Sequence, residues 1–152
     1  MTNRRAFLGL LVALPVVGTI VRPALASSPE VFATDGVAIN GYDPVAYFSQ
    51  SAPVLGDETH ALIWRGATWY FSSANNMVRF EANPELFAPQ YGGYCAFAVS
   101  KGATASTVPE AWTIHEEKLY LNYSLPVREI WRGDIPGNIG KADANWPGVL
   151  DT

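Results

Sequence analysis

Thiol and imidazole side chains are the first candidates for chemistry in this chain, and there are few of them. The sequence has one cysteine, Cys95, and two histidines, His60 and His115. No two of them have the close spacing of a metal-ligand pair. Copper or another soft transition metal is the cofactor that Cys95, His60 and His115 would suit if the fold brought them together.

Cys95 is the strongest single candidate. If a helix begins near Gly93, the Cys95 thiol lies in its first turn, where the helix dipole lowers the pKa of a thiol. Cys95 would then be a metal ligand, or a nucleophile paired with His60 or His115. The alternative is an inert cysteine in the core, since free cysteine is among the most buried residue types. His60 and His115 have a similar alternative as surface or hydrogen-bonded histidines.

The residues directly before Cys95 are suited to a ligand-binding loop: Tyr91, Gly92, Gly93 and Tyr94. Glycine lets a ligand approach the backbone closely, and tyrosine hydroxyls give directed hydrogen bonds. Asp43 and Tyr47 are candidates for the same small-ligand site. The alternatives are structural: a tight Gly-Gly turn under packed aromatic rings and, for Asp43, the cap of a helix.

Two β-hairpins are predicted to position these residues. Residues 61–64 and 68–71 flank Arg65-Gly66, and residues 112–115 and 118–123 flank Glu116-Glu117. The polar residues 50–59 are predicted to be a loop.

The predicted helices begin after capping residues. Asp43 caps a short helix, and Ser72 or Ser73 caps a second one that carries Met77 on its buried face. Further helical segments are expected at residues 84–87, 93–99, 124–131 and 136–146. The predicted fold is therefore α+β, with short antiparallel β-hairpins covered by helices and a helical C-terminus.

The N-terminus is typical of an exported protein. Arg4-Arg5 precedes an uncharged apolar stretch over residues 6–21, and Ala24 and Ala26 form an A-x-A cleavage pattern. Residues 1–26 predict a twin-arginine-like signal peptide, because about 16 apolar residues are short for a membrane-spanning helix, which needs roughly 20. An uncleaved anchor is the alternative. Residues 27–35 are interpreted as a short tether and residues 36–152 as one domain.

The predicted mature chain is acidic. Without residues 1–26 it has seven basic and fourteen acidic residues, a net charge of about −7. This charge argues against nucleic acid and anionic membranes as partners, and we expect no stable membrane insertion after signal cleavage. The expected location is the periplasm or the cell exterior. A single cysteine cannot form an intrachain disulfide there, so the domain depends on packing. The sequence indicates no particular protein partner.

Six blocks of residues carry a family resemblance: 41–48, 69–76, 80–84, 89–96, 118–123 and 142–147. Together they resemble the exported single-domain proteins of the YHS-domain family, over residues 36–147. The resemblance implies a small core similar to a treble clef. Treble clefs bind metals, and some YHS domains belong to copper and heavy-metal transport ATPases.

This chain departs from the metal-binding pattern of that family. Family members carry cysteines in the blocks D-P-V-C-G-M and F-C-S-x-x-C, whereas Ala46, Ser72 and Asn76 occupy the matching positions here. Hydroxyl and amide groups do not replace thiolates on zinc or copper(I). A treble-clef metal site is therefore not expected at these positions.

Three functions remain open at this point. The favoured one is a periplasmic binding or sensing module for copper or a small ligand, centred on residues 91–95. The second is a thiol-dependent enzyme that uses Cys95, although the chain has no nucleophile-elbow triad, phosphate loop or HExxH motif. The third is a structural or partner-binding domain without a small-molecule site.

Overall fold

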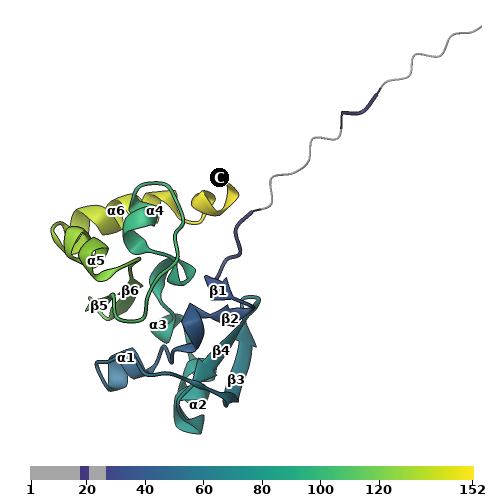
Figure 1. Cartoon of the computed structure of the whole chain (residues 1–152), viewed down its shortest axis with the longest axis vertical. Helices are drawn as coiled ribbons and strands as arrows, with labels where there is room; N and C mark the ends of the chain where they lie inside the picture. The colour runs from purple at the N-terminus through teal and green to yellow at the C-terminus, as the bar shows by residue number, and fades with distance from the viewer. Residues whose placement is uncertain (1–17, 21–26) are drawn as a thin grey trace, which may run out of the picture.

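Two small sheets and a set of short helices make up the part of the chain that the computed structural model describes, residues 18–20 and 27–152 (Figure 1). The elements in chain order are β1 (Ala33–Thr34), β2 (Val37–Ala38), the 3-10 helix η1 (Ile39–Gly41), α1 (Ala46–Ser49), β3 (Asp57–Trp64), β4 (Ala67–Phe71), α2 (Ala74–Ala82), α3 (Pro84–Phe87), the 3-10 helix η2 (Gln90–Gly93), α4 (Ala96–Ser100), β5 (Trp112–His115), β6 (Lys118–Leu121), α5 (Leu125–Arg132), α6 (Ile135–Asn145) and the 3-10 helix η3 (Gly148–Asp151). The α+β prediction is confirmed.

The larger sheet has the strand order β1-β2-β4-β3. Its β1–β2 and β3–β4 pairs are antiparallel, whereas β2 and β4 are parallel and meet at Val37 and Thr68. Strands β5 and β6 form a separate antiparallel pair. The larger sheet and α2 form one end of the molecule, and β5, β6 and the helices α4, α5 and α6 gather at the other end (Figure 1).

Both predicted hairpins are present, and each closes through a two-residue turn. The turn residues have positive φ angles: 49° and 77° for Arg65 and Gly66, and 49° and 64° for Glu116 and Glu117. Positive φ at both positions is what a type I′ turn requires, because its twist matches that of the paired strands. The first turn places Arg65 at the tip of the β3–β4 hairpin.

The buried side chains form two clusters. The first packs the larger sheet against α2 and β6 around Trp69, Phe71 and Phe80. The second packs η2, α4, α5 and α6 around Tyr91 and Trp131. The ring of Phe32 contacts both clusters.

The predicted helix caps at the two serines are present. The Ser73 hydroxyl accepts the Asn76 amide at 3.1 Å at the start of α2, and the Ser124 hydroxyl accepts the Val127 amide at 3.2 Å at the start of α5. Met77 on α2 packs against the first cluster, as predicted.

Two boundary predictions are wrong. Residues 50–59 are not all loop, because β3 begins at Asp57 and a register shift between Asp57 and Ala61 lets polar residues continue the strand. The helix expected over 93–99 begins only at Ala96, and Cys95 is the residue before it. Gly93 instead ends η2 with a φ of 87°.

The interpretation of residues 27–35 as a tether is also wrong, because this segment packs into the domain. The Phe32 amide donates to the Gly92 carbonyl at 2.9 Å, and the Tyr94 hydroxyl donates to the Pro29 carbonyl at 2.8 Å. Val31 is only 2 % exposed and belongs to the first cluster. The segment therefore lies between the two ends of the molecule and contacts both.

The predicted signal peptide lies outside the described residues, apart from residues 18–20, which form no helix or strand. It stays a prediction from the sequence. None of the helices within residues 18–20 and 27–152 has both the length and the apolar character needed to cross a bilayer.

Gly92→Ala is expected to lower the free energy of unfolding by about 3 kcal/mol, from a strained positive φ and a backbone clash. Gly92 has a φ of 62°, and a Cβ atom there would overlap the Glu30 carbonyl oxygen. Gly102→Ala is the matched control, since Gly102 has a φ of 81° but no atom within 4 Å of the added Cβ. Urea unfolding of both variants measures the difference, and equal losses would contradict close packing at Gly92.

Candidate functional site

The Cys95 thiol lies in the core rather than in an open site. Cys95 is 1 % exposed, and its Sγ accepts the Tyr123 amide at 3.3 Å. The thiol donates in turn to Asn122 Oδ1 at 3.5 Å, and the same oxygen accepts the Phe97 amide at 3.1 Å. These contacts use the thiol as both donor and acceptor. Helix α4 has only five residues, so the expected helix-terminal activation of Cys95 has little support.

The two histidines lie on different hairpins. His60 is a half-buried residue of β3, and His115 ends β5, with its Nε2 4.0 Å from a carboxylate oxygen of Glu116. Among residues 18–20 and 27–152 no group of three or more His, Cys, Asp or Glu side chains could hold a metal ion. Cys95, His60 and His115 therefore do not form the metal site that the sequence offered.

Asp43 is fully buried and connects three segments of the chain. Its Oδ1 accepts the Val45 and Ala46 amides at 2.8 and 3.3 Å, which is the predicted cap of α1. Its Oδ2 accepts the Ser72 amide and hydroxyl at 2.8 and 2.7 Å and the Asn76 Nδ2 at 2.7 Å. The carboxylate thus ties α1 to the end of β4 and the start of α2.

Asp43 thereby gathers Ala46, Ser72 and Asn76, the three residues that stand at cysteine positions of the YHS-domain family, which the sequence resembles. Ala46 contributes only its backbone amide, and Ser72 and Asn76 contribute a hydroxyl and an amide that already bond to the carboxylate. This donor set has no thiolate or imidazole and does not fit copper or zinc. The role of Asp43 is structural.

Three further candidate residues also have structural roles. Tyr47 is fully buried, and its hydroxyl donates to the Pro109 carbonyl at 2.9 Å. Burial, with a smaller effect of the Glu110 charge, raises the pKa of Tyr47 well above its usual value. A Cβ atom on Gly93 would clash with the Ile39 side chain. The Tyr94 hydroxyl holds Pro29, as described above, and burial raises the pKa of Tyr94.

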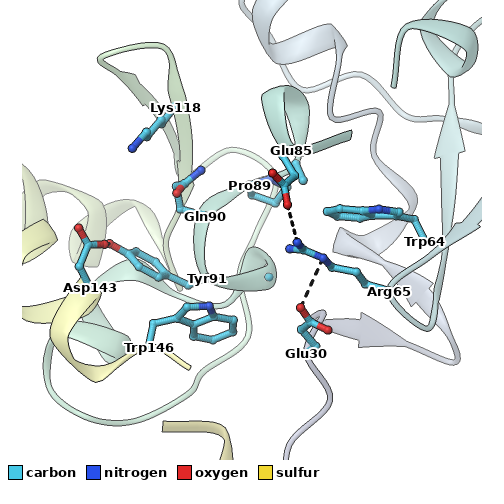
Figure 2. Close-up of a pocket in the computed structure, with 12 residues that line it drawn as sticks. Glu30, Trp64, Arg65, Glu85, Pro89, Gln90, Tyr91, Lys118, Asp143 and Trp146 are labelled. Carbon is cyan, nitrogen blue, oxygen red and sulfur yellow. Dashed lines mark hydrogen bonds and ion pairs between the residues drawn. The ribbon is translucent and has the colours of Figure 1, made fainter. Parts of the chain in front are cut away.

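Tyr91 and Gly92, by contrast, line an open cleft of about 470 Å³ (Figure 2). The cleft lies between the β3–β4 turn and the N-terminal half of η2, with the C-terminal end of α6 on the far side. Its lining residues are Glu30, Trp64, Arg65, Glu85, Ala88, Pro89, Gln90, Tyr91, Gly92, Lys118, Asp143 and Trp146. Cys95, His60 and His115 are not among them.

One wall of the cleft is built around Arg65. Its guanidinium lies over the Trp64 ring, 4.3 Å from the ring centroid. Its Nε is 3.4 Å from a carboxylate oxygen of Glu30, and its Nη2 is 2.8 Å from one of Glu85 (Figure 2). Although such pairs are individually weak at a surface, two carboxylates and a ring fix the orientation of this side chain.

The opposite wall is built around Tyr91. Its hydroxyl donates to Asp143 Oδ1 at 2.8 Å, and its ring meets the Trp146 ring at 63° with centroids 5.9 Å apart (Figure 2). Burial, followed by the hydrogen bond to Asp143 and its charge, raises the pKa of Tyr91 well above the usual value. The phenol therefore stays protonated at neutral pH and keeps Asp143 in place as a hydrogen-bond acceptor.

Most residues of the cleft were not predicted from the sequence. Trp64 and Arg65 come from one segment and Asp143 and Trp146 from another far along the chain, and no local spacing connects the two. The signal in the sequence was the Tyr-Gly-Gly-Tyr run at residues 91–94. In the structure, Tyr91 of this run has a left-handed φ of 58°, which aromatic residues rarely adopt.

Comparison of the chain with protein-family models, with curated proteins and with solved structures finds no match.

Asp43→Asn is expected to lower the free energy of unfolding by about 3 kcal/mol. The two carboxylate oxygens of Asp43 accept five hydrogen bonds, and the substitution replaces one of these oxygens with an NH₂ group that can only donate. The measurement is urea unfolding. The control is Asp57→Asn, which changes an exposed carboxylate that accepts the Thr59 amide and hydroxyl. A loss no larger than that of the control would contradict the structural role of Asp43.

Iodoacetamide is expected to leave Cys95 unmodified in the native protein and to alkylate it after unfolding in guanidinium, because the thiol is buried and hydrogen-bonded. Mass spectrometry measures the modification. The control is Ser106→Cys, which places a second thiol at an exposed position and should react in the native state. Rapid alkylation of native Cys95 would restore the thiol-enzyme hypothesis.

Proposed function

We propose that this protein is a binding module that holds a small polar organic molecule in the cleft beside Tyr91. The observation that carries this proposal is the cleft itself, with a volume of about 470 Å³ and three aromatic and five charged side chains in its lining. Ligand sites typically combine such a volume with aromatic surface and a few placed polar groups. The proposal keeps the binding role inferred from the sequence and moves its centre from Cys95 to Tyr91.

The packing around the cleft supports a preformed site. Tyr91 is 6 % exposed, and its rigid turn is fixed by the contact between Gly92 and residues 30–32. Arg65 is held by two carboxylates and an indole ring. A ligand that enters would therefore need little reordering of these side chains, which lowers the entropic cost of binding.

We also propose that the protein acts in the periplasm or outside the cell and belongs to the YHS-domain family. The export pattern in residues 1–26 supports the first part. The convergence of Ala46, Ser72 and Asn76 on Asp43 supports the second, because the corresponding cysteines converge on a metal in a treble clef. The copper and thiol-enzyme versions receive no such support, since Cys95 is buried, has its thiol hydrogen-bonded to Asn122 and Tyr123, and does not line the cleft.

A screen of small polar aromatic compounds by NMR tests the binding function. In spectra of the ¹⁵N-labelled protein, we expect saturable shifts of the Trp146 indole signal and of the amides at residues 90–92. The shallower groove beside Tyr70, of about 430 Å³, serves as an internal control and should show none. If no compound shifts the cleft signals, this proposal is wrong.

Trp146→Phe is expected to weaken binding of any compound found in this screen by several-fold, because it removes part of the aromatic wall. Trp112→Phe is the matched control, since Trp112 is a partly buried tryptophan whose ring contacts the Tyr47 ring at a tilt of 50° and does not line the cleft. Equal affinities of the two variants would place the compound elsewhere on the protein.

A further inference from the structure

The two walls of the cleft are built from the same kinds of group. Each has an indole ring and a carboxylate connected by a third side chain: Arg65 lies between Trp64 and the carboxylates of Glu30 and Glu85 on one side, and Tyr91 lies between Trp146 and Asp143 on the other (Figure 2). On the first wall a guanidinium of the protein itself, that of Arg65, covers the indole face and pairs with the carboxylates. On that wall the carboxylates and the indole face therefore already have a cation as their partner.

The second wall has no such cation. Within residues 18–20 and 27–152 no lysine or arginine lies over the Trp146 ring, and no basic side chain forms an ion pair with Asp143. The Asp143 carboxylate has a single neutral hydrogen-bond partner, the Tyr91 hydroxyl at 2.8 Å. An aromatic corner and a carboxylate without a counter-ion thus face the cleft together.

The charges of the lining favour a positive occupant. Three carboxylates, from Glu30, Glu85 and Asp143, face two cations, from Arg65 and Lys118. Arg65 is shared by two of the carboxylates, and Lys118 is an exposed residue of the rim (Figure 2). The residues from 27 onward, those of the cleft included, carry a net charge of about −7 in total, and the resulting field concentrates cations near the protein.

We propose that the ligand of this cleft is an organic cation, an amine or guanidine carried on an apolar body. Its charged group lies against Asp143 and the rings of Tyr91 and Trp146, as the Arg65 guanidinium lies against Trp64 and its carboxylates. Cation–π contact and ion pairing then act on the same charged group, at the open side of the cleft where Asp143 is exposed. This assignment rests on the proposed function, since it names the ligand class of the same cleft.

An anionic ligand fits the cleft less well. Its best partner, Arg65, already bonds two carboxylates, so an anion would have to displace Glu30 or Glu85 or remain at Lys118. A zwitterion would use Lys118 and Asp143 together. Lys118 therefore separates the ligand classes: removing it weakens binding of an anion or zwitterion but leaves a cation unaffected or better bound.

Four probes with the same phenylethyl body test the ligand class: phenethylammonium, phenylalanine, 3-phenylpropionate and 2-phenylethanol. Binding is followed by the shift of the Trp146 indole NMR signal at low salt. We expect phenethylammonium to bind at least about tenfold more tightly than the neutral and anionic probes, which corresponds to about 1.4 kcal/mol. Added salt should weaken its binding.

Three variants connect the preference to the named residues. Asp143→Asn keeps an acceptor for the Tyr91 hydroxyl and is expected to weaken phenethylammonium about tenfold, as for a lost charged contact. Lys118→Ala should leave its affinity unchanged or raise it. Glu58→Gln removes a carboxylate from the groove beside Tyr70 and should have no effect.

The outcomes separate this inference from the binding function itself. Tighter binding of 3-phenylpropionate or phenylalanine at Trp146, lost in Lys118→Ala, would overturn the cationic ligand and leave a binding cleft. Binding of phenethylammonium that Asp143→Asn does not weaken would also overturn it. Failure of all four probes to shift the Trp146 signal, with a compound of the wider screen still shifting it, would overturn the cationic ligand alone, whereas failure of every compound would overturn both proposals.

Discussion

The contact between residues 28–32 and the turn of η2 is the constraint on which the rest of the structure depends. The backbone of Gly92 lies so close to the Glu30 carbonyl that no side chain fits there. This contact places the carboxylate of Glu30 beside Arg65 on one wall of the cleft. It also holds Tyr91 in its left-handed conformation on the other wall. Both walls are therefore positioned by the same few backbone contacts.

A second polar centre organises the larger sheet. The buried Asp43 carboxylate joins α1, β4 and α2 through five hydrogen bonds. A charged acceptor with several donors links these segments without any metal. These residues offer no thiolate or imidazole to a metal. The candidate site is therefore the cleft beside Tyr91 rather than the surroundings of Asp43.

The cysteine and the cleft show that a rare residue type does not by itself mark the candidate site. Cys95 is the least common residue type in the chain, but its thiol is enclosed by Asn122 and Tyr123 and serves packing. The charged residues of the cleft are common types, and their value lies in their arrangement. Both walls of the cleft carry aromatic rings and carboxylates. On the Arg65 wall a guanidinium of the protein pairs with the carboxylates, whereas the Tyr91 wall within the described residues has no such cation. That asymmetry is the basis of the proposed ligand class.

Local sequence determined most of the secondary structure, and tertiary contacts determined the site. Hairpin turns and serine caps depend on neighbouring residues, so the β3–β4 turn at Arg65 and the cap at Ser73 were predicted correctly. The burial of Cys95 and the docking of residues 27–35 depend on segments far apart in the chain. The facing of Arg65 and Asp143 depends in the same way on three elements packing together. Sequence alone therefore indicated residues 91–95 as a candidate site, and only the fold decided that Tyr91 and Gly92 line the cleft and which charges surround them.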